Sequence, residues 1–225
     1  MIPDRACVQF GIGVVPATVA AALTDRCDLG IHSELMSDSL MALIRSGAVS
    51  NRYKAANPHK SVFNIAMGSQ DLYTFLDDNP AVECHGADYV NDPYVIAQND
   101  NVVSINAFIE IDLHGAVNAE FLDGRQYSAP GGQLDFVRGA RMSTGGLSVL
   151  AAGSTASGGT VSRIVPRLTS MTTDPRTAVQ YIATEFGICD LEGKSTSERA
   201  RALIELAHPD FRADLTKTAR AMRFF

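Results

Sequence analysis

The fold is decided by residues 8–32, which read VQFGIGVVPATVAAALTDRCDLGIH. Apolar residues dominate Val8–Ile12, as expected of a buried strand, and the Ala-rich stretch Pro16–Leu23 predicts a helix with proline in its first turn. Asp28–His32 has the composition of a second buried strand. A strand, a glycine turn, a helix and a strand in this order predict an α/β fold with a parallel sheet.

The rest of the chain continues the alternation of short apolar runs and helix-like segments, with no repeat or linker, and so predicts one α/β domain. The strongest helix signal is Lys194–Ala207, where Ser195 and Glu198 have capping-box spacing. A polar turn at His114-Gly115 indicates hairpins in a β-rich region. The other helices are predicted at Ser37–Arg45 and Gln70–Asn79, and the strands at Ser61–Met67, Val102–Asn106, Phe108–Leu113, Ala116–Phe121, Val149–Ala152, Val161–Ile164 and Tyr181–Thr184.

The composition of the 225 residues is that of a soluble globular protein. They are 46% hydrophobic and 20% charged, and 19 basic against 25 acidic side chains give a net charge of −6. Because Lys and Arg are scattered, we expect no nucleic-acid partner, and the locally basic Arg212–Arg223 is interpreted as the solvated face of a terminal helix. No run reaches the ~18 apolar residues of a membrane helix, and no secretory leader is recognisable. We therefore expect a cytoplasmic protein without a membrane partner.

The cysteines and the missing motifs argue against a metal site. Cys7, Cys27, Cys84 and Cys189 stand far apart without a CxxC pair, so we expect reduced thiols. The sequence contains no HExxH helix, GxSxG elbow or Walker loop, and no histidine pair with metal-ligand spacing. We therefore expect a metal-free site.

Two candidate sites follow predicted strands in the first part of the chain. Gly11-Ile12-Gly13 precedes a helix, where it either brings backbone close to an anionic ligand or simply makes a tight turn. Glu34, in Ile31-His32-Ser33-Glu34, follows a strand whose carboxyl end is where α/β sheets gather ligands. Taken alone, a surface glutamate at a helix start explains Glu34 better, and His32 is similarly ambiguous.

Three further candidates lie in the second half of the chain. In Ala129–Phe136 the adjacent Gly131 and Gly132 leave amide groups open to an oxyanion, or form a simple loop. The glycine-rich Ser154–Thr160 could cradle a phosphate or merely turn. Glu185 again follows a predicted strand, with a helix cap as the alternative explanation.

These pieces, in this order, resemble the acetyl-CoA hydrolase/transferase family, and most closely its 4-hydroxybutyrate and butyrate CoA-transferases. The resemblance implies a CoA-transferase-like α/β domain with a mostly parallel central sheet, helices on both faces and β-rich insertions. It covers nearly the whole chain and is carried by GIGVVPATVAAAL (11–23), DLGIHSELMSD (28–38), YVNDPYVIAQNDNVVSINAFIEIDLHGAVNAE (89–120), GGQLDFVRGA (131–140), GGTVSRIVPRL (158–168) and TEFGICDLEGKSTSERARALIELAHPDFR (184–212).

The resemblance assigns roles to individual residues. It implies that Glu34 is the covalent nucleophile of a ping-pong CoA transfer through a glutamyl-CoA thioester, which reverses the interpretation from the residues alone. The backbone amide of Gly132, with Gly131 beside it, is implied as the oxyanion donor. Glu185 is implied to shape the active site, and Asn118 matches an asparagine there. Coenzyme A is implied to contact Gln9, Phe10, Gly11, Ile12, Gly13, Ile109 and Gly132.

Two departures from the family pattern affect these expectations. Ser157 stands where relatives often have a lysine before GGT, and loss of that cation would weaken contact with the CoA phosphates. Family chains are also about twice as long, and residues 1–225 match only the C-terminal, glutamate-bearing half. We therefore expect an N-terminal-half-like subunit or a homo-oligomer as partner, besides acyl-CoA and a short-chain carboxylate. The alternative is a truncated gene or an isolated domain.

Two competing functions stay open at this stage. The first is acyl-CoA hydrolysis, in which water takes the second half-reaction. The second is a non-catalytic CoA-binding subunit that has lost the other half of the enzyme.

Overall fold

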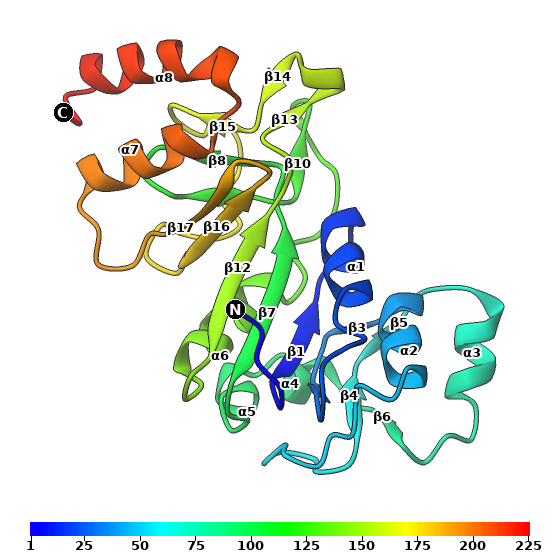
Figure 1. Cartoon of the computed structure of the whole chain (residues 1–225). Helices are drawn as coiled ribbons and strands as arrows, with labels where there is room; N and C mark the ends of the chain where they lie inside the picture. Colours follow the sequence, from blue (N-terminus) through cyan, green and yellow to red (C-terminus); the bar gives the residue numbers. More distant parts are fainter. The chain divides into compact units, whose positions relative to one another are not determined.

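The computed structural model describes residues 1–225, which divide into two compact units (Figure 1). Unit 1 comprises Met1–Asn106 and Asp135–Ser148, and unit 2 comprises Ala107–Leu134 and Val149–Phe225. Parallel strands joined by helices dominate unit 1, and unit 2 adds antiparallel hairpins. The predicted α/β class is confirmed.

The parallel sheet of unit 1 is built on the stretch that opens the sequence. Strand β1 (Cys7–Phe10) pairs in parallel with β2 (Gly30–Ile31) on one side and with β7 (Val102–Ala107) on the other. Helix α1 (Val14–Ala21) connects β1 to β2 and contacts β1, as Figure 1 shows in blue. The predicted strand–turn–helix–strand unit is thus confirmed. The strand predicted at Val102–Asn106 is confirmed as β7, and its partner is the distant strand β1.

Further short parallel pairs extend unit 1. Strand β3 (Leu35–Met36) pairs with β5 (Ile65–Ala66), and β4 (Ser61–Phe63) pairs with β6 (Val82–Cys84). The single strand predicted over residues 61–67 is interrupted at Asn64, where the backbone leaves β6 and turns toward β3. His32, which follows β2, forms an isolated parallel bridge with Val62 of β4. The residues after β4 therefore lie beside the residues after β2.

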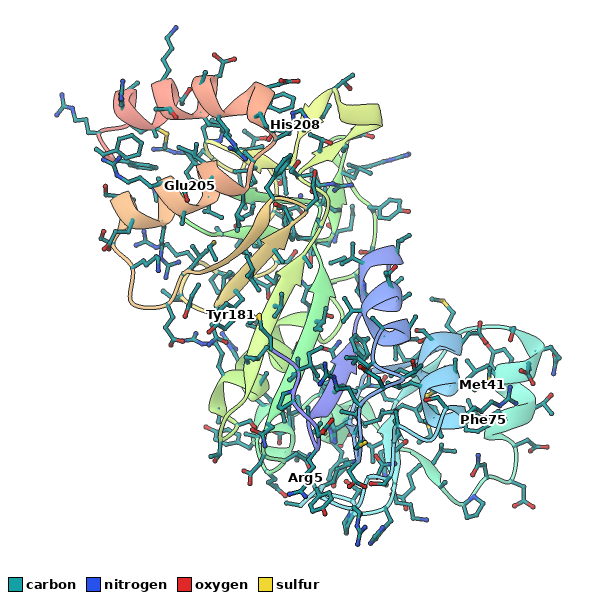
Figure 2. The ribbon with its side chains drawn as sticks, in the orientation of Figure 1. Arg5, Met41, Phe75, Tyr181, Glu205 and His208 are labelled. Carbon is teal, nitrogen blue, oxygen red and sulfur yellow. The ribbon has the colours of Figure 1, made fainter.

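Helices α2 (Asp38–Arg45) and α3 (Gln70–Leu76) form where the sequence predicts helices. Ser37 caps α2 by accepting a hydrogen bond from the amide of Leu40. The two helices contact each other, and Figure 2 labels Met41 on α2 and Phe75 on α3. The guanidinium of Arg45 lies 5.3 Å from the centre of the Phe75 ring.

The core of unit 1 contains three helices that the sequence patterns did not predict, namely α4 (Ala87–Val90), α5 (Pro93–Ile96) and α6 (Gln133–Met142). Phe136 of α6 is fully buried, and removing such a side chain from water contributes about 1.5–3 kcal/mol. These helices pack on the strands through a cluster formed by Cys7, Val62, Tyr89, Val90, Ile96, Val102, Phe136 and Ala140.

Unit 2 contains several short hairpins. Strands β8 (Glu110–Asp112) and β9 (Val117–Asn118) are antiparallel across the predicted His114-Gly115 turn, and β15 (Ile164–Val165) joins β8 in parallel. The other two pairs are β10 (Phe121–Leu122) with β11 (Arg125–Gln126), and β13 (Thr155–Ala156) with β14 (Val161–Ser162), the latter joined through the short 3-10 turn η1 (Ser157–Gly159).

Three further strands, the first of which begins in unit 1, are followed by two long helices. Strand β12 (Leu147–Ala151) pairs in parallel with β16 (Tyr181–Thr184), and β17 (Gly187–Asp190) returns antiparallel to β16. Helix α7 (Thr196–Leu206) contacts this hairpin and α8 (Pro209–Ala221) contacts α7, as Figure 1 shows in orange and red. The capping box of Ser195 and Glu198 is confirmed, and so is the terminal helix.

Three features bear on the environment of the chain. All four cysteines are free. None of the helices combines the length and the apolar character that crossing a membrane would require. No three His, Cys, Asp or Glu side chains lie close enough together to hold a metal ion.

Candidate active site

Glu34 lies in unit 1 between β2 and β3, just beyond the carboxyl end of a parallel strand. Its residue is half-buried, and its backbone carbonyl accepts hydrogen bonds from the amides of Asn64 (3.1 Å) and Ile65 (3.0 Å). The position after a strand is confirmed. The alternative, a surface glutamate at a helix start, is wrong because Glu34 precedes a further strand and α2 begins only at Asp38.

Asn91 provides the side-chain contact to Glu34. Its Nδ2 donates a hydrogen bond of 3.1 Å to Oε1 of Glu34, and its Oδ1 accepts a bond of 3.0 Å from Nδ2 of Asn64. Sequence reasoning missed Asn91 because 57 positions separate it from Glu34 and no local pattern marks it. An amide that donates to a carboxylate oxygen restricts the rotamer of that carboxylate.

Two buried basic side chains support the segment that leads to Glu34. His32 is 1% exposed, and its Nε2 donates to the carbonyl of Val90 at 2.9 Å. Burial lowers the pKa of His32 to about 4, so the ring is neutral near pH 7. Lys54 is 5% exposed and donates from Nζ to the carbonyls of Ile31 (2.7 Å) and Lys60 (2.6 Å). Burial lowers the pKa of Lys54 to about 8.

Asp135 adds a second carboxyl group to the electrostatic surroundings of Glu34. Burial raises its pKa, the charge of Arg138 opposes that shift, and the negative charges of Glu34 and Asp92 reinforce it. Asp135 stands in the first turn of α6, within the GGQLDF segment. The negative charges of Glu34 and Asp92 therefore favour the protonated form of Asp135.

The Gly11–Gly13 turn joins β1 to α1, as predicted. A Cβ on Gly11 would lie 2.3 Å from Oδ1 of Asn106, so the close approach of these two residues requires glycine. The side chain of Gln9 is buried and pairs with Asn106 (2.9 and 3.1 Å) and with Ser104 (2.6 Å). Gln9 therefore fixes Asn106, the residue that Gly11 approaches, through two hydrogen bonds. Ile12, by contrast, is 67% exposed to solvent.

The glycine pair Gly131 and Gly132 lies in unit 2, immediately before the first residue of α6. Gly131 has φ 58°, a left-handed conformation that favours glycine, and Gly132 is buried. The next residue, Gln133, donates from Nε2 to Oδ2 of the fully buried Asp174 at 2.6 Å. The segment is a turn that leads directly into α6 and is anchored through Gln133 to a buried carboxylate.

A cavity of about 660 Å³ in unit 2 is lined by Ile109 and Ser157, two residues singled out by the sequence. The carbonyl of Ile109 accepts from Nη1 of Arg163 at 2.8 Å, and Arg163 also lines the cavity. The glycine-rich segment 154–160 forms the β13–β14 hairpin beside it. The cavity therefore presents an arginine, the carboxylates of Glu110 and Asp123, hydroxyl groups and apolar surface together.

Glu185 lies in the turn between β16 and β17, so its interpretation as a helix cap is wrong. Its carboxylate accepts from the amide of Ser154 at 2.7 Å and from the Ser154 hydroxyl at 2.6 Å. Burial would raise the pKa of Glu185, but these hydrogen bonds outweigh it and hold that pKa below its usual value. The side chain of Asn118 is committed within unit 2, where its Nδ2 donates to Glu110 and to the carbonyl of Phe121.

These observations define an α/β protein in which a glutamate, aligned by an asparagine amide, follows a parallel strand. The model of the acetyl-CoA hydrolase/transferase C-terminal domain matches residues 68–219. The chain belongs to the acetyl-CoA hydrolase/transferase family, as its sequence segments predict.

Two curated relatives and one solved structure illustrate the similarity. The chain is 47% identical to succinyl-CoA:cyclohexane-1-carboxylate CoA transferase of Geobacter metallireducens, over 99% of this chain and 51% of that one. It is 46% identical to 4-hydroxybutyrate coenzyme A transferase of Clostridium kluyveri, over 96% and 51% respectively. RipA from Yersinia pestis superposes with a TM-score of 0.96 at 54% identity, over 100% of this chain and 51% of RipA. The chain spans about half the length of the curated relatives it matches.

Proposed function

We propose that this chain is the glutamate-bearing half of a CoA-transferase, which moves CoA between an acyl-CoA and a short carboxylic acid with Glu34 as covalent nucleophile. The observation that carries the proposal is the carboxylate of Glu34, placed beyond β2 and aligned by Asn91 in a chain of this family. Both curated relatives are named as CoA transferases, which supports the same reaction class.

The proposed first half-reaction conserves the energy of the thioester. An oxygen of Glu34 attacks the acyl carbonyl carbon, and the resulting oxyanion collapses by breaking the C–S bond, which yields a mixed anhydride and free CoA thiolate. The thiolate then attacks the side-chain carbonyl carbon of Glu34. Breaking the C–O bond releases the carboxylate of the donor and leaves a glutamyl-CoA thioester. An acceptor carboxylate reverses these steps, so no water, oxidant or net proton is consumed.

The residues around Glu34 suit this sequence of steps. Asn91 holds one carboxylate oxygen through its amide, so the attacking oxygen is presented in a fixed direction. The negative charge of the ground-state carboxylate is spread onto the substrate during attack, which relieves repulsion from Asp135. We assign the amide of Gly132 as donor to the oxyanion, with Gly131 beside it, because adjacent glycines have no side chains to keep a substrate away from the backbone.

CoA binding is proposed at two places. The first is the Gly11–Gly13 turn at the start of α1, where Phe10 and Gln9 supply the rigid base. The second is the cavity that Ile109 and Ser157 line, where Arg163 offers a cation for a phosphate. Glu185 is proposed to order the neighbouring segment through its two hydrogen bonds to Ser154.

A partner that resembles the N-terminal half of the family, or a second copy of this chain, is proposed to complete the enzyme. The support is that relatives are matched over only about half of their length. The four free cysteines are in keeping with a reducing, cytoplasmic compartment, which we propose as the location. Native purification that yields a lone monomer with full transferase activity would refute the need for a partner.

The function is tested by supplying butyryl-CoA with and without acetate to the protein and any companion it purifies with. A transferase forms acetyl-CoA only when acetate is present, and Glu34→Gln abolishes that product. Hydrolysis is a rival because the family itself includes acetyl-CoA hydrolases. Release of free CoA at the same rate with and without acetate would establish hydrolysis instead. If the protein binds CoA but forms neither acetyl-CoA nor free CoA, it is a non-catalytic CoA-binding subunit.

A further inference from the structure

Three side chains of unit 1 form a directed row that ends on Glu34. Nδ2 of Asn64 donates to Oδ1 of Asn91 at 3.0 Å, and Nδ2 of Asn91 donates to Oε1 of Glu34 at 3.1 Å. Asn64 also donates its backbone amide to the Glu34 carbonyl at 3.1 Å. Asn64 therefore contacts Glu34 directly through its backbone amide and indirectly through the side chain of Asn91.

The direction of this row is set by the chemistry of its last member. An ionised carboxylate accepts hydrogen bonds and donates none, so the amide of Asn91 must turn its NH2 toward Glu34. The carbonyl oxygen of Asn91 then faces Asn64, which must in turn present its own NH2. This orientation leaves Oδ1 of Asn64, at the far end of the row, buried without a hydrogen-bond partner. The hydrogen bond to Asn91 is made in this orientation of the Asn64 amide.

We propose that Asn64 is a positioning residue for the reaction, which holds the amide of Asn91 in the only orientation that aligns the Glu34 carboxylate. This inference rests on the proposed role of Glu34 as nucleophile. The side chain of Asn64 donates to Asn91 rather than to the Glu34 carboxylate, so it acts through Asn91. Because its side chain donates to only one group, its contribution is separable from the backbone bond that every residue at position 64 retains.

His32 secures the backbone on which Asn91 stands. Its Nε2 donates at 2.9 Å to the carbonyl of Val90, the residue immediately before Asn91. Val90 is fully buried, and Asn91 terminates the short helix α4. His32 therefore restrains the backbone just before Asn91, and Asn64 restrains the end of the Asn91 side chain.

The proposal predicts an unusual order among substitutions of Asn64. In Asn64→Asp the new carboxylate accepts but cannot donate, so it recruits the NH2 of Asn91 and turns the Asn91 oxygen against Glu34. In Asn64→Ala the amide of Asn91 loses a partner but keeps its bond to Glu34. The isosteric aspartate should thus lower kcat by about 10- to 100-fold, the loss expected for a hydrogen bond to a charged group, and alanine should lower it by less. KM for acyl-CoA should change little in both, because alignment of the nucleophile affects the chemical step.

A purely structural role predicts the reverse order, because alanine removes more atoms than aspartate does. The direct effect of a new negative charge beside Glu34 is controlled by repeating both substitutions in an Asn91→Ser background. There the row is already broken, so aspartate and alanine should give the same kcat. Alanine as damaging as aspartate, or an aspartate penalty that persists without Asn91, would overturn the proposal.

A second readout does not depend on turnover. In the parent chain, nuclear magnetic resonance should show the side-chain NH2 protons of Asn91 protected from exchange with solvent, and Asn64→Asp should shift those resonances. If the Asn91 NH2 protons exchange freely in the parent, or if their resonances do not shift in Asn64→Asp, the hydrogen-bonded row does not exist. If the parent shows the protected amide while acyl-CoA never modifies Glu34, then the proposed function fails and the positioning geometry stands.

Discussion

Replacing His32 by glutamine should remove a pH dependence of stability that the buried ring imposes on the protein. Burial, reinforced by the positive charges of Lys54 and His85, lowers the pKa of His32 from 6.5 to about 4. In the unfolded chain the ring is solvated and recovers the ordinary value. Between these two pH values the unfolded state therefore binds a proton that the folded state does not.

The sign and the size of the effect follow from that difference. As pH falls below 6.5, protonation of the unfolded chain favours unfolding, and this loss of stability ends when the folded ring also protonates near pH 4. At about 1.4 kcal/mol for each pKa unit, the free energy of unfolding falls by about 3 kcal/mol across this window. That is a large share of the roughly 5–15 kcal/mol that keeps a domain folded.

Urea unfolding followed by circular dichroism, between neutral pH and pH 4, measures this difference. His32→Gln keeps a donor for the Val90 carbonyl and does not titrate, so it should be less stable than the parent at neutral pH and should lose less stability on acidification. His59→Gln is the matched control, because His59 is exposed and its loss removes a histidine without opening the core. Parallel pH profiles for His32→Gln and the parent would refute the reasoning.

Two further substitutions test the local geometry. Gly11→Ala places a methyl group 2.3 Å from Oδ1 of Asn106 and should lower the free energy of unfolding by about 1–3 kcal/mol, as overpacking does; unchanged denaturation would contradict the tight turn. Ser195→Ala removes the cap of α7, so thermal unfolding should show a loss of about 1 kcal/mol, and an unaltered midpoint would mean that the capping box contributes nothing.

Local chemistry determined how much of the fold was predictable from the sequence. The helix α7 followed from its capping box, and the β1–α1–β2 unit followed from apolar runs around a glycine turn, because those signals lie within a few residues of each other. The strand at residues 102–106 was predicted from its composition, but its pairing with β1 was not, because the two strands are about 95 positions apart. Helix α6 was missed because the glycine pair before it resembles a loop, although Phe136, Val137 and Ala140 have helical spacing.

The same distinction applies to the candidate site. Glu34 was found because it follows a strand and matches a family segment, and its position after β2 is as predicted. Asn91 and Asn64 could not be found, since their relevance arises only when the end of β4 and the end of α4 meet beside Glu34. The helix-cap alternative for Glu185 failed because GICD continues as strand β17 rather than as a helix. Pairing between distant segments, which no local pattern encodes, hid Asn64 and Asn91, whereas Glu185 was misassigned within a local hairpin.

The most direct test of the account is the chemical state of Glu34 after exposure to acyl-CoA. Borohydride reduces a glutamyl-CoA thioester to an alcohol, so the peptide that contains Glu34 should lose one oxygen and gain two hydrogens in mass spectrometry. The account predicts this change in the parent chain with its companion, and its absence when acyl-CoA is omitted or when Glu34 is replaced by glutamine. Acyl exchange that proceeds at an undiminished initial rate in Glu34→Gln, with no modified peptide in the parent, would contradict it.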